Sequence, residues 1–131
     1  MNIIIKGSHI EITAAIDMYV KKKLIVGASN MGDSLIDYAV GKAGDISKWI
    51  SAKLGFVFGI DISKDNIHNK LDGACARFLN ANKKYPRLFR GLFVNGDSKL
   101  NIRDGTAFST EKDKQIARAV FGVGPKDVSL L

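Results

Sequence analysis

The sequence has little of what secreted, membrane-spanning or disordered proteins are built from. One cysteine, Cys75, among 131 residues excludes an internal disulfide framework and favours a reducing compartment. No apolar run approaches the roughly 18 residues that a membrane span requires, and the run at residues 3–5 is too short for a signal peptide. With 46% hydrophobic and 25% charged residues, the chain is instead expected to form one globular domain with a core.

Acidic residues are also few. The chain has 20 Lys and Arg against 13 Asp and Glu, which gives a formal net charge of +7 and a pI near 9.6. In a chain of this length the excess favours an anionic partner such as RNA, a nucleotide or phosphate. A basic surface that only maintains solubility explains the same excess, so charge alone leaves both interpretations open.

Apolar segments alternate between strand-like and helix-like patterns. Short apolar runs bounded by turn residues predict strands at residues 2–5, 34–40, 56–62 and 88–94. Helical spacing predicts helices over 11–24, over 45–54 with Gly55 as the terminating residue, from a cap at Ser63 to at least Phe78, and over 109–121. This alternation is typical of a parallel, doubly wound α/β sheet, in which ligands bind at the carboxyl ends of the strands where the strand order reverses.

A glycine turn follows the second predicted strand, and an acidic residue ends the third. Gly41 allows a sharp turn and a close approach of the backbone to a ligand. Asp61 lies 20 residues further on, the spacing at which a carboxylate accepts hydrogen bonds from a ribose diol in nucleotide-binding βαβ units. A structural turn beside a solvated Asp61 is the alternative. His9 and His68 have no partners at metal-ligand spacing, so no metal site is expected.

The residues around this turn resemble a known motif. Residues 35–49 (LIDYAVGKAGDISKW) are similar to the first motif of mRNA cap guanine-N7 methyltransferases, with matches at Asp37, Gly41, Lys42, Gly44, Asp45, Lys48 and Trp49. Residues 59–63 (GIDIS) resemble the second motif and residues 94–98 (VNGDS) the third. The resemblance is strongest to the capping-type enzymes of large DNA viruses and covers about residues 19–131. It implies a Rossmann-like α/β fold that binds S-adenosyl-L-methionine.

The resemblance also implies the residues that bind this cofactor: Lys21, Asp37, Gly41, Asp61, Asp97 and Ser98. In the family, the matching positions place Lys21 at the methionine carboxylate and Asp37 and Gly41 beside the methionine moiety. Asp61 would hold the ribose hydroxyls, and we expect Asp61→Ala to weaken cofactor binding by roughly 1.5–3 kcal/mol while the fold survives.

The adenine end of the implied site comes from the third motif. Asp97 would accept a hydrogen bond from the adenine amino group, with Ser98 beside it. The chain departs from the family pattern at Ala39 and Ala43, which replace glycines, and at Met18, where the family usually has Asn. Ala43 destabilises the turn if its backbone requires a positive φ.

The implied activity is methylation of guanine N7 at the 5′ GpppN end of capped RNA, alongside other capping-enzyme domains. N7 carries a lone pair and the sulfonium is an activated methyl donor, so no catalytic base is expected. About three parallel strands are predicted, fewer than this fold normally has. We therefore expect residues 19–131 to be a partial, cofactor-binding domain without activity of its own, residues 1–18 to be an extension, and the location to be cytoplasmic, in a host cell or virion if viral.

Two other functions remain open. Residues 1–24 resemble the opening strand and helix of ribosome hibernation-promoting factors, which predicts a ribosome-associated stress factor. The glycine turn and acidic strand end are also typical of dinucleotide-dependent oxidoreductases, although the turn lacks the Gly-x-Gly-x-x-Gly pattern.

Overall fold

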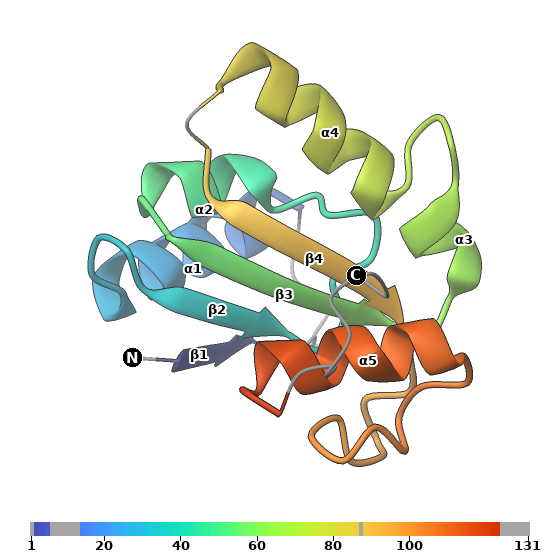
Figure 1. The fold of residues 1–131 in the computed structure, drawn as a ribbon. Helices are drawn as coiled ribbons and strands as arrows, with labels where there is room; N and C mark the ends of the chain where they lie inside the picture. Colours follow the sequence, from blue (N-terminus) through green and yellow to red (C-terminus); the bar gives the residue numbers. More distant parts are fainter. Residues whose placement is uncertain (1, 6–13, 87, 124–131) are drawn as a thin grey trace.

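Four parallel strands form the single sheet of the structure, a computed structural model that describes residues 2–5, 14–86 and 88–123. The strands are β1 (Asn2–Ile5), β2 (Ser34–Asp37), β3 (Phe56–Asp61) and β4 (Arg90–Asn95), and they lie in the order β1-β2-β3-β4 (Figure 1). The register sets Asp37 beside Gly59 and Asp61 beside Asn95. Asp61, the predicted acidic strand end, therefore lies at the same edge of the sheet as Asp37, where β2 ends before the predicted residue 40.

Helices cover both faces of the sheet. They are α1 (Ala14–Ala28), α2 (Ile46–Ser51), α3 (Lys64–His68), α4 (Ala74–Lys84) and α5 (Glu111–Val120). One face carries α1, α2 and α4, and the other carries α5 (Figure 1). The predicted parallel, Rossmann-like α/β fold is thereby confirmed. No described helix is long and apolar enough to cross a bilayer.

The predicted reversal of strand order is wrong for the described strands. Each crossover steps to the next strand in the same direction, so the right-handed connections place α1, α2 and α4 on a single face. Among the described helices, α5, after β4, packs on the other face. The carboxyl edge is thus built by neighbouring loops that follow β2, β3 and β4, without a switch point between them.

The larger core lies under α1, α2 and α4, with Trp49 fully buried at its centre. The Trp49 ring meets Phe89 edge-on at 5.7 Å between centroids and stacks with Phe93 at 6.2 Å. On the other face, Val94 is only 1% exposed because α5 and the loop before it cover the strand. Leu92, at 37% exposed, is the least covered apolar residue of β4.

The N-terminal segment joins the sheet. β1 pairs with β2 from Asn2 beside Ser34 to Ile5 beside Asp37, which makes it a fourth strand beyond the three predicted for the methyltransferase-like unit. The helix α1 continues to Ala28, so the lysines at 21–23 lie inside it rather than in its last turn. The proposed boundary between residues 18 and 19 falls within α1 and remains a prediction. Residues 6–13 of the segment that resembles hibernation factors lie outside the described residues.

The single helix predicted after Ser63 is wrong, because the chain forms two helices. Ser63 does cap the first one, its hydroxyl accepting from Asn66 N at 3.3 Å. The Asn69 side chain then accepts from the backbone N–H of Leu71 at 3.0 Å, a local turn that competes with the helix. Gly73 allows the close packing of this turn, since a Cβ there would lie 2.7 Å from Asn69 N. Leu71 is consequently 88% exposed instead of facing the core.

The end of α2 also differs from the prediction. The helix ends at Ser51, and the left-handed residue after it is Lys53, with φ +53°, rather than Gly55. Gly55 is required for another reason, because a Cβ there would lie 2.6 Å from the carbonyl oxygen of Gly32. Lys53 therefore holds a conformation that glycine adopts at lower free energy, and its side chain is exposed at this end of the sheet.

Candidate cofactor-binding site

The turn between β2 and α2 passes over the end of β3. Val40 N donates to Ile60 O at 3.0 Å, and Gly41 N donates to Asp61 Oδ2 at 2.9 Å. Gly41 has φ +57°, a conformation that favours glycine. A Cβ built on Gly41 would meet nothing within 4 Å, so open space lies beside this turn. The two residues chosen from their spacing, Gly41 and Asp61, are thus in direct contact.

Asp61 connects this turn to the loop that follows β3. It is only 9% exposed, and its Oδ1 accepts from Ser63 N at 2.8 Å and from Asn66 Nδ2 at 3.1 Å. Together with the Gly41 bond, these contacts occupy three of the roughly four acceptor positions of a carboxylate. Asp61 is therefore a structural as well as a candidate binding residue. The expectation that the fold tolerates its removal needs revision.

Asp37 ends β2 and is 5% exposed. Its Oδ1 accepts from Ala39 N at 3.1 Å, within the same turn. Burial, together with the negative charges of Asp45 and Asp61, raises the pKa of Asp37 to about 6, although the Ala39 hydrogen bond and Lys21 oppose the shift. The site thus holds a carboxylate that lacks sufficient positive charge nearby.

Lys21 reaches the site from α1. Its Nζ lies 3.4 Å from Asp45 Oδ2, and the other oxygen of Asp45 contacts the buried ammonium of Lys48. Asp45 precedes the first residue of α2, but its side chain makes no capping hydrogen bond. Lys21 therefore lies beside the turn and is connected to it through Asp45, and its role toward a cofactor remains a prediction.

The third motif lies at the end of β4, next to Asp61. Gly96 N donates to Asp61 O at 3.0 Å, and Asn95 Nδ2 donates to the carbonyls of both Asp61 and Ile62 at 2.9 Å. Asp97 follows, half-buried, with its Oδ1 accepting from Lys99 N at 3.0 Å. Ser98 is exposed at the same edge.

The motif lysine, Lys42, turns away from Asp61 toward the loop between α3 and α4. Its Nζ lies 2.9 Å from both carboxylate oxygens of Asp72 and 3.5 Å from Asp65 Oδ2. The Asp72 carboxylate raises the pKa of Lys42. This lysine ties the turn to the neighbouring loop.

The two alanines that replace family glycines differ in their effect. Ala43 has φ +57° and is 1% exposed, so its backbone is strained while its methyl group is buried in the larger core. The strain expected at Ala43 is confirmed. Ala39 is exposed and is not among the described residues with positive φ, so the missing glycine has no backbone penalty there. The side chain of Met18 lies outside the described part of the chain.

The structure therefore brings Asp37, Gly41 and Asp61 together, with Lys21 and Asp97 at the same edge. The sequence reasoning missed Asn66 and Asn95, which hold the carboxylate and the backbone of Asp61. Two features of the sequence could have indicated them: Asn66 lies five residues after Asp61, and Asn95 lies at the end of the next strand. Within the described residues no group of three or more His, Cys, Asp or Glu is arranged to hold a metal ion, and His9 lies outside them.

Comparison with known proteins returns short partial matches and no matching family model. The chain is 28% identical over 85 residues to a probable mRNA-capping enzyme of Acanthamoeba polyphaga mimivirus, a match that covers 65% of the chain and 7% of that protein. It is 41% identical over 49 residues (37% of the chain) to mRNA cap guanine-N(7) methyltransferase 1 of Oryza sativa subsp. japonica, and 37% identical over 51 residues (39% of the chain) to its Arabidopsis thaliana namesake.

These matches span only 7% to 14% of the length of the curated relatives. Their names nevertheless agree with the family that the motifs at the glycine turn and the strand ends resemble. The resemblance of this chain to mRNA cap guanine-N7 methyltransferases is confirmed.

Proposed function

We propose that the chain binds S-adenosyl-L-methionine at the carboxyl edge of its sheet and serves methyl transfer to the guanine N7 of capped RNA. The observation that carries the proposal is the set of three carboxylates, Asp37, Asp45 and Asp61, around the open turn at Gly41. Their mutual repulsion contributes to the raised pKa of Asp37. A site of this kind gains free energy when a cationic ligand enters it.

Charge distinguishes this cofactor from a dinucleotide. S-adenosyl-L-methionine carries a sulfonium and an ammonium group, whereas the pyrophosphate of NAD is an anion that dinucleotide-binding turns hold at a helix N-terminus. Here Asp45 stands immediately before α2, and the Gly41 N–H already donates to Asp61. A pyrophosphate would meet negative charge and an occupied donor, which favours the methyltransferase proposal over the oxidoreductase alternative.

The residues at the edge fit the parts of the cofactor. Asp61 has about one acceptor position left for a ribose hydroxyl, and a second bond requires that one of its present donors move to the ligand. Asp37 would accept from the ammonium group, and Lys21 would attract the carboxylate while it remains near Asp45. Asp97, with one oxygen bonded to Lys99 N, offers its other oxygen to the adenine amino group, beside Ser98.

Methyl transfer requires these side chains mainly to position the cofactor and the guanine. Bound S-adenosyl-L-methionine supplies an activated methyl group, and guanine N7 supplies the lone pair. The turn at Gly41 would orient the bound cofactor. Its backbone is held in place by the hydrogen bonds from Val40 N to Ile60 O and from Gly41 N to Asp61 Oδ2. Positioning in line accounts for most of the acceleration that such a transfer needs. The capped RNA and other capping-enzyme domains are proposed partners, in line with the names of the relatives.

Calorimetric titration tests the cofactor directly. We expect S-adenosylhomocysteine and S-adenosyl-L-methionine to bind the chain and NAD to give no heat of binding. The sulfonium cofactor should bind the more tightly of the first two, because it adds the sulfonium charge to the ammonium group that both ligands bring to the carboxylates. Binding of NAD without binding of S-adenosylhomocysteine would replace the proposal with the oxidoreductase alternative.

A further inference from the structure

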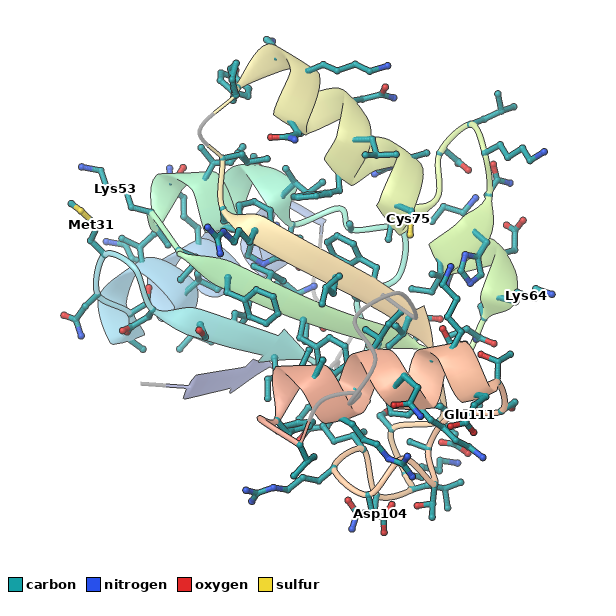
Figure 2. All side chains as sticks on the ribbon, viewed as in Figure 1. Met31, Lys53, Lys64, Cys75, Asp104 and Glu111 are labelled. Atoms are coloured by element: carbon teal, nitrogen blue, oxygen red, sulfur yellow. The ribbon has the colours of Figure 1, made fainter. Side chains whose placement is uncertain are left out.

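A hollow lies at the opposite end of the sheet from the carboxylates. It has a volume of about 620 Å³ and lies between the end of α2 and the segment that joins α4 to β4. Its lining includes Trp49, Lys53, Leu54, Lys84, Tyr85 and Phe89. Leu54 precedes β3 and Phe89 precedes β4, so the hollow is at the amino ends of these strands. Figure 2 shows Lys53 at this end and Lys64 and Glu111 at the other.

The walls of this hollow are apolar and aromatic, and its charged residues are basic. Tyr85 is 47% exposed, and Lys84 Nζ lies 5.4 Å from the centre of its ring. Lys53 lies in the left-handed conformation after α2, with its side chain exposed. The part of the lining that the structure describes contains no Asp or Glu. The volume falls within the range of small-ligand sites, and the charge is complementary to an anion.

Trp49 lies in the wall of the hollow as a fully buried residue, and its indole Nε1 has no hydrogen-bond acceptor among the described residues. The choice of ligand therefore rests on the surface of the hollow. Its aromatic surface and basic residues together match the base and phosphates of a nucleotide.

We propose that this hollow binds one nucleotide of a single-stranded RNA, with its base on Tyr85 and its phosphates at Lys53 and Lys84. Stacking on an exposed aromatic ring between lysines is the way in which proteins hold single strands without reading their sequence. This hollow would be a contact for the RNA substrate, and in that respect the inference rests on the proposed function. It requires no bound cofactor, so the two proposals are tested separately.

Trp49 is the single tryptophan of the chain, so its fluorescence reports on the hollow. A short single-stranded oligouridylate is titrated without cofactor, with tryptophan emission and the anisotropy of labelled RNA as readouts. The double variant Lys53→Gln with Lys84→Gln is compared with Lys64→Gln with Lys112→Gln, which removes two exposed lysines at the other end. Tyr85→Ala is compared with Tyr85→Phe.

We expect RNA to change the Trp49 emission and the Lys53/Lys84 variant to bind at least about fivefold more weakly than the control pair. Its salt dependence should fall by about 1.4 in log–log slope, which corresponds to two lost phosphate contacts. Tyr85→Ala should weaken binding by about fivefold or more, and Tyr85→Phe should restore it. Equal effects of the two lysine pairs, or unchanged Trp49 emission at saturation, would overturn the proposal. Binding of polyglutamate but not RNA in the hollow would also overturn it, in favour of an acidic protein partner.

Discussion

Replacing Asp61 with alanine should both weaken cofactor binding by roughly 1.5–3 kcal/mol and lower the free energy of unfolding by about 2–4 kcal/mol. The variant leaves the Gly41 and Ser63 N–H groups and the Asn66 amide without their acceptor. Asp61 is buried, so water replaces these bonds incompletely. Chemical denaturation followed by circular dichroism, together with calorimetric titration of S-adenosylhomocysteine, measures the two effects.

Asn66→Ala separates the two roles of Asp61. It removes one donor to the carboxylate and leaves the Gly41 and Ser63 contacts in place. We expect it to lower the free energy of unfolding by only about 1 kcal/mol and to change cofactor affinity by a few-fold. If Asp61→Ala unfolded at the wild-type denaturant concentration, the hydrogen bonds that join the turn to α3 would not contribute to stability as described.

Replacing Asp37 with asparagine should have effects of opposite sign on stability and on binding. The pKa of Asp37 is raised from 3.8 to about 6, mainly by burial. Between these values the folded chain holds a proton that the unfolded chain releases, so stability is greatest below pH 4 and falls as the pH rises through 6. The loss amounts to roughly 3 kcal/mol for a shift of this size. Asparagine stays neutral and avoids this loss.

At pH 7.5 the Asp37→Asn variant should therefore be more stable than the wild type, by up to about 3 kcal/mol, while near pH 4 the two should coincide. Its affinity for S-adenosyl-L-methionine should drop about tenfold or more, because a charged acceptor for the ammonium group is lost. Thermal denaturation across this pH range and calorimetry are the measurements. Loss of stability at pH 7.5 would show that the charge of Asp37 is compensated in the folded chain.

Asp104→Asn is the matched control for the charge change. Asp104 is exposed in the loop after β4, and the Thr106 N–H lowers its pKa. This carboxylate contributes stability above its unfolded pKa and loses it as the pH falls. Its neutral variant should accordingly gain nothing at pH 7.5 and leave cofactor affinity unchanged.

The sequence predicted the elements of the sheet better than their order. Buried parallel strands are apolar on both faces, so the runs around Val57 and Val94 identified β3 and β4 to within a few residues. Apolar periodicity carries no information on which strands are neighbours. The reversal of strand order was therefore assumed from the fold class, and the observed order β1-β2-β3-β4 contradicts it. The prediction of one continuous helix through Leu71 is wrong for a different reason. Leu71 continues the apolar spacing, but the local hydrogen bonds of Asn69 end α3 before it.

At the site, spacing identified the contact between Gly41 and Asp61 because the turn and the strand end belong to one βαβ unit. It did not reveal that Asp61 is already bonded by Ser63 and Asn66, or that Lys21 pairs with Asp45. Such contacts depend on side-chain directions after packing. The raised pKa of Asp37 likewise follows from burial, which only the assembled sheet determines.

The most direct test of the central claim is the location of cofactor binding, measured by amide chemical shifts of the ¹⁵N-labelled chain titrated with S-adenosylhomocysteine. We expect shifts at Gly41 and Ser63, whose N–H groups donate to the Asp61 carboxylate, and at Asp97 after β4, and none at Lys84 or Tyr85 at the far end of the sheet. Saturable binding that moves Lys84 and Tyr85 while Gly41 and Ser63 stay unchanged would contradict it.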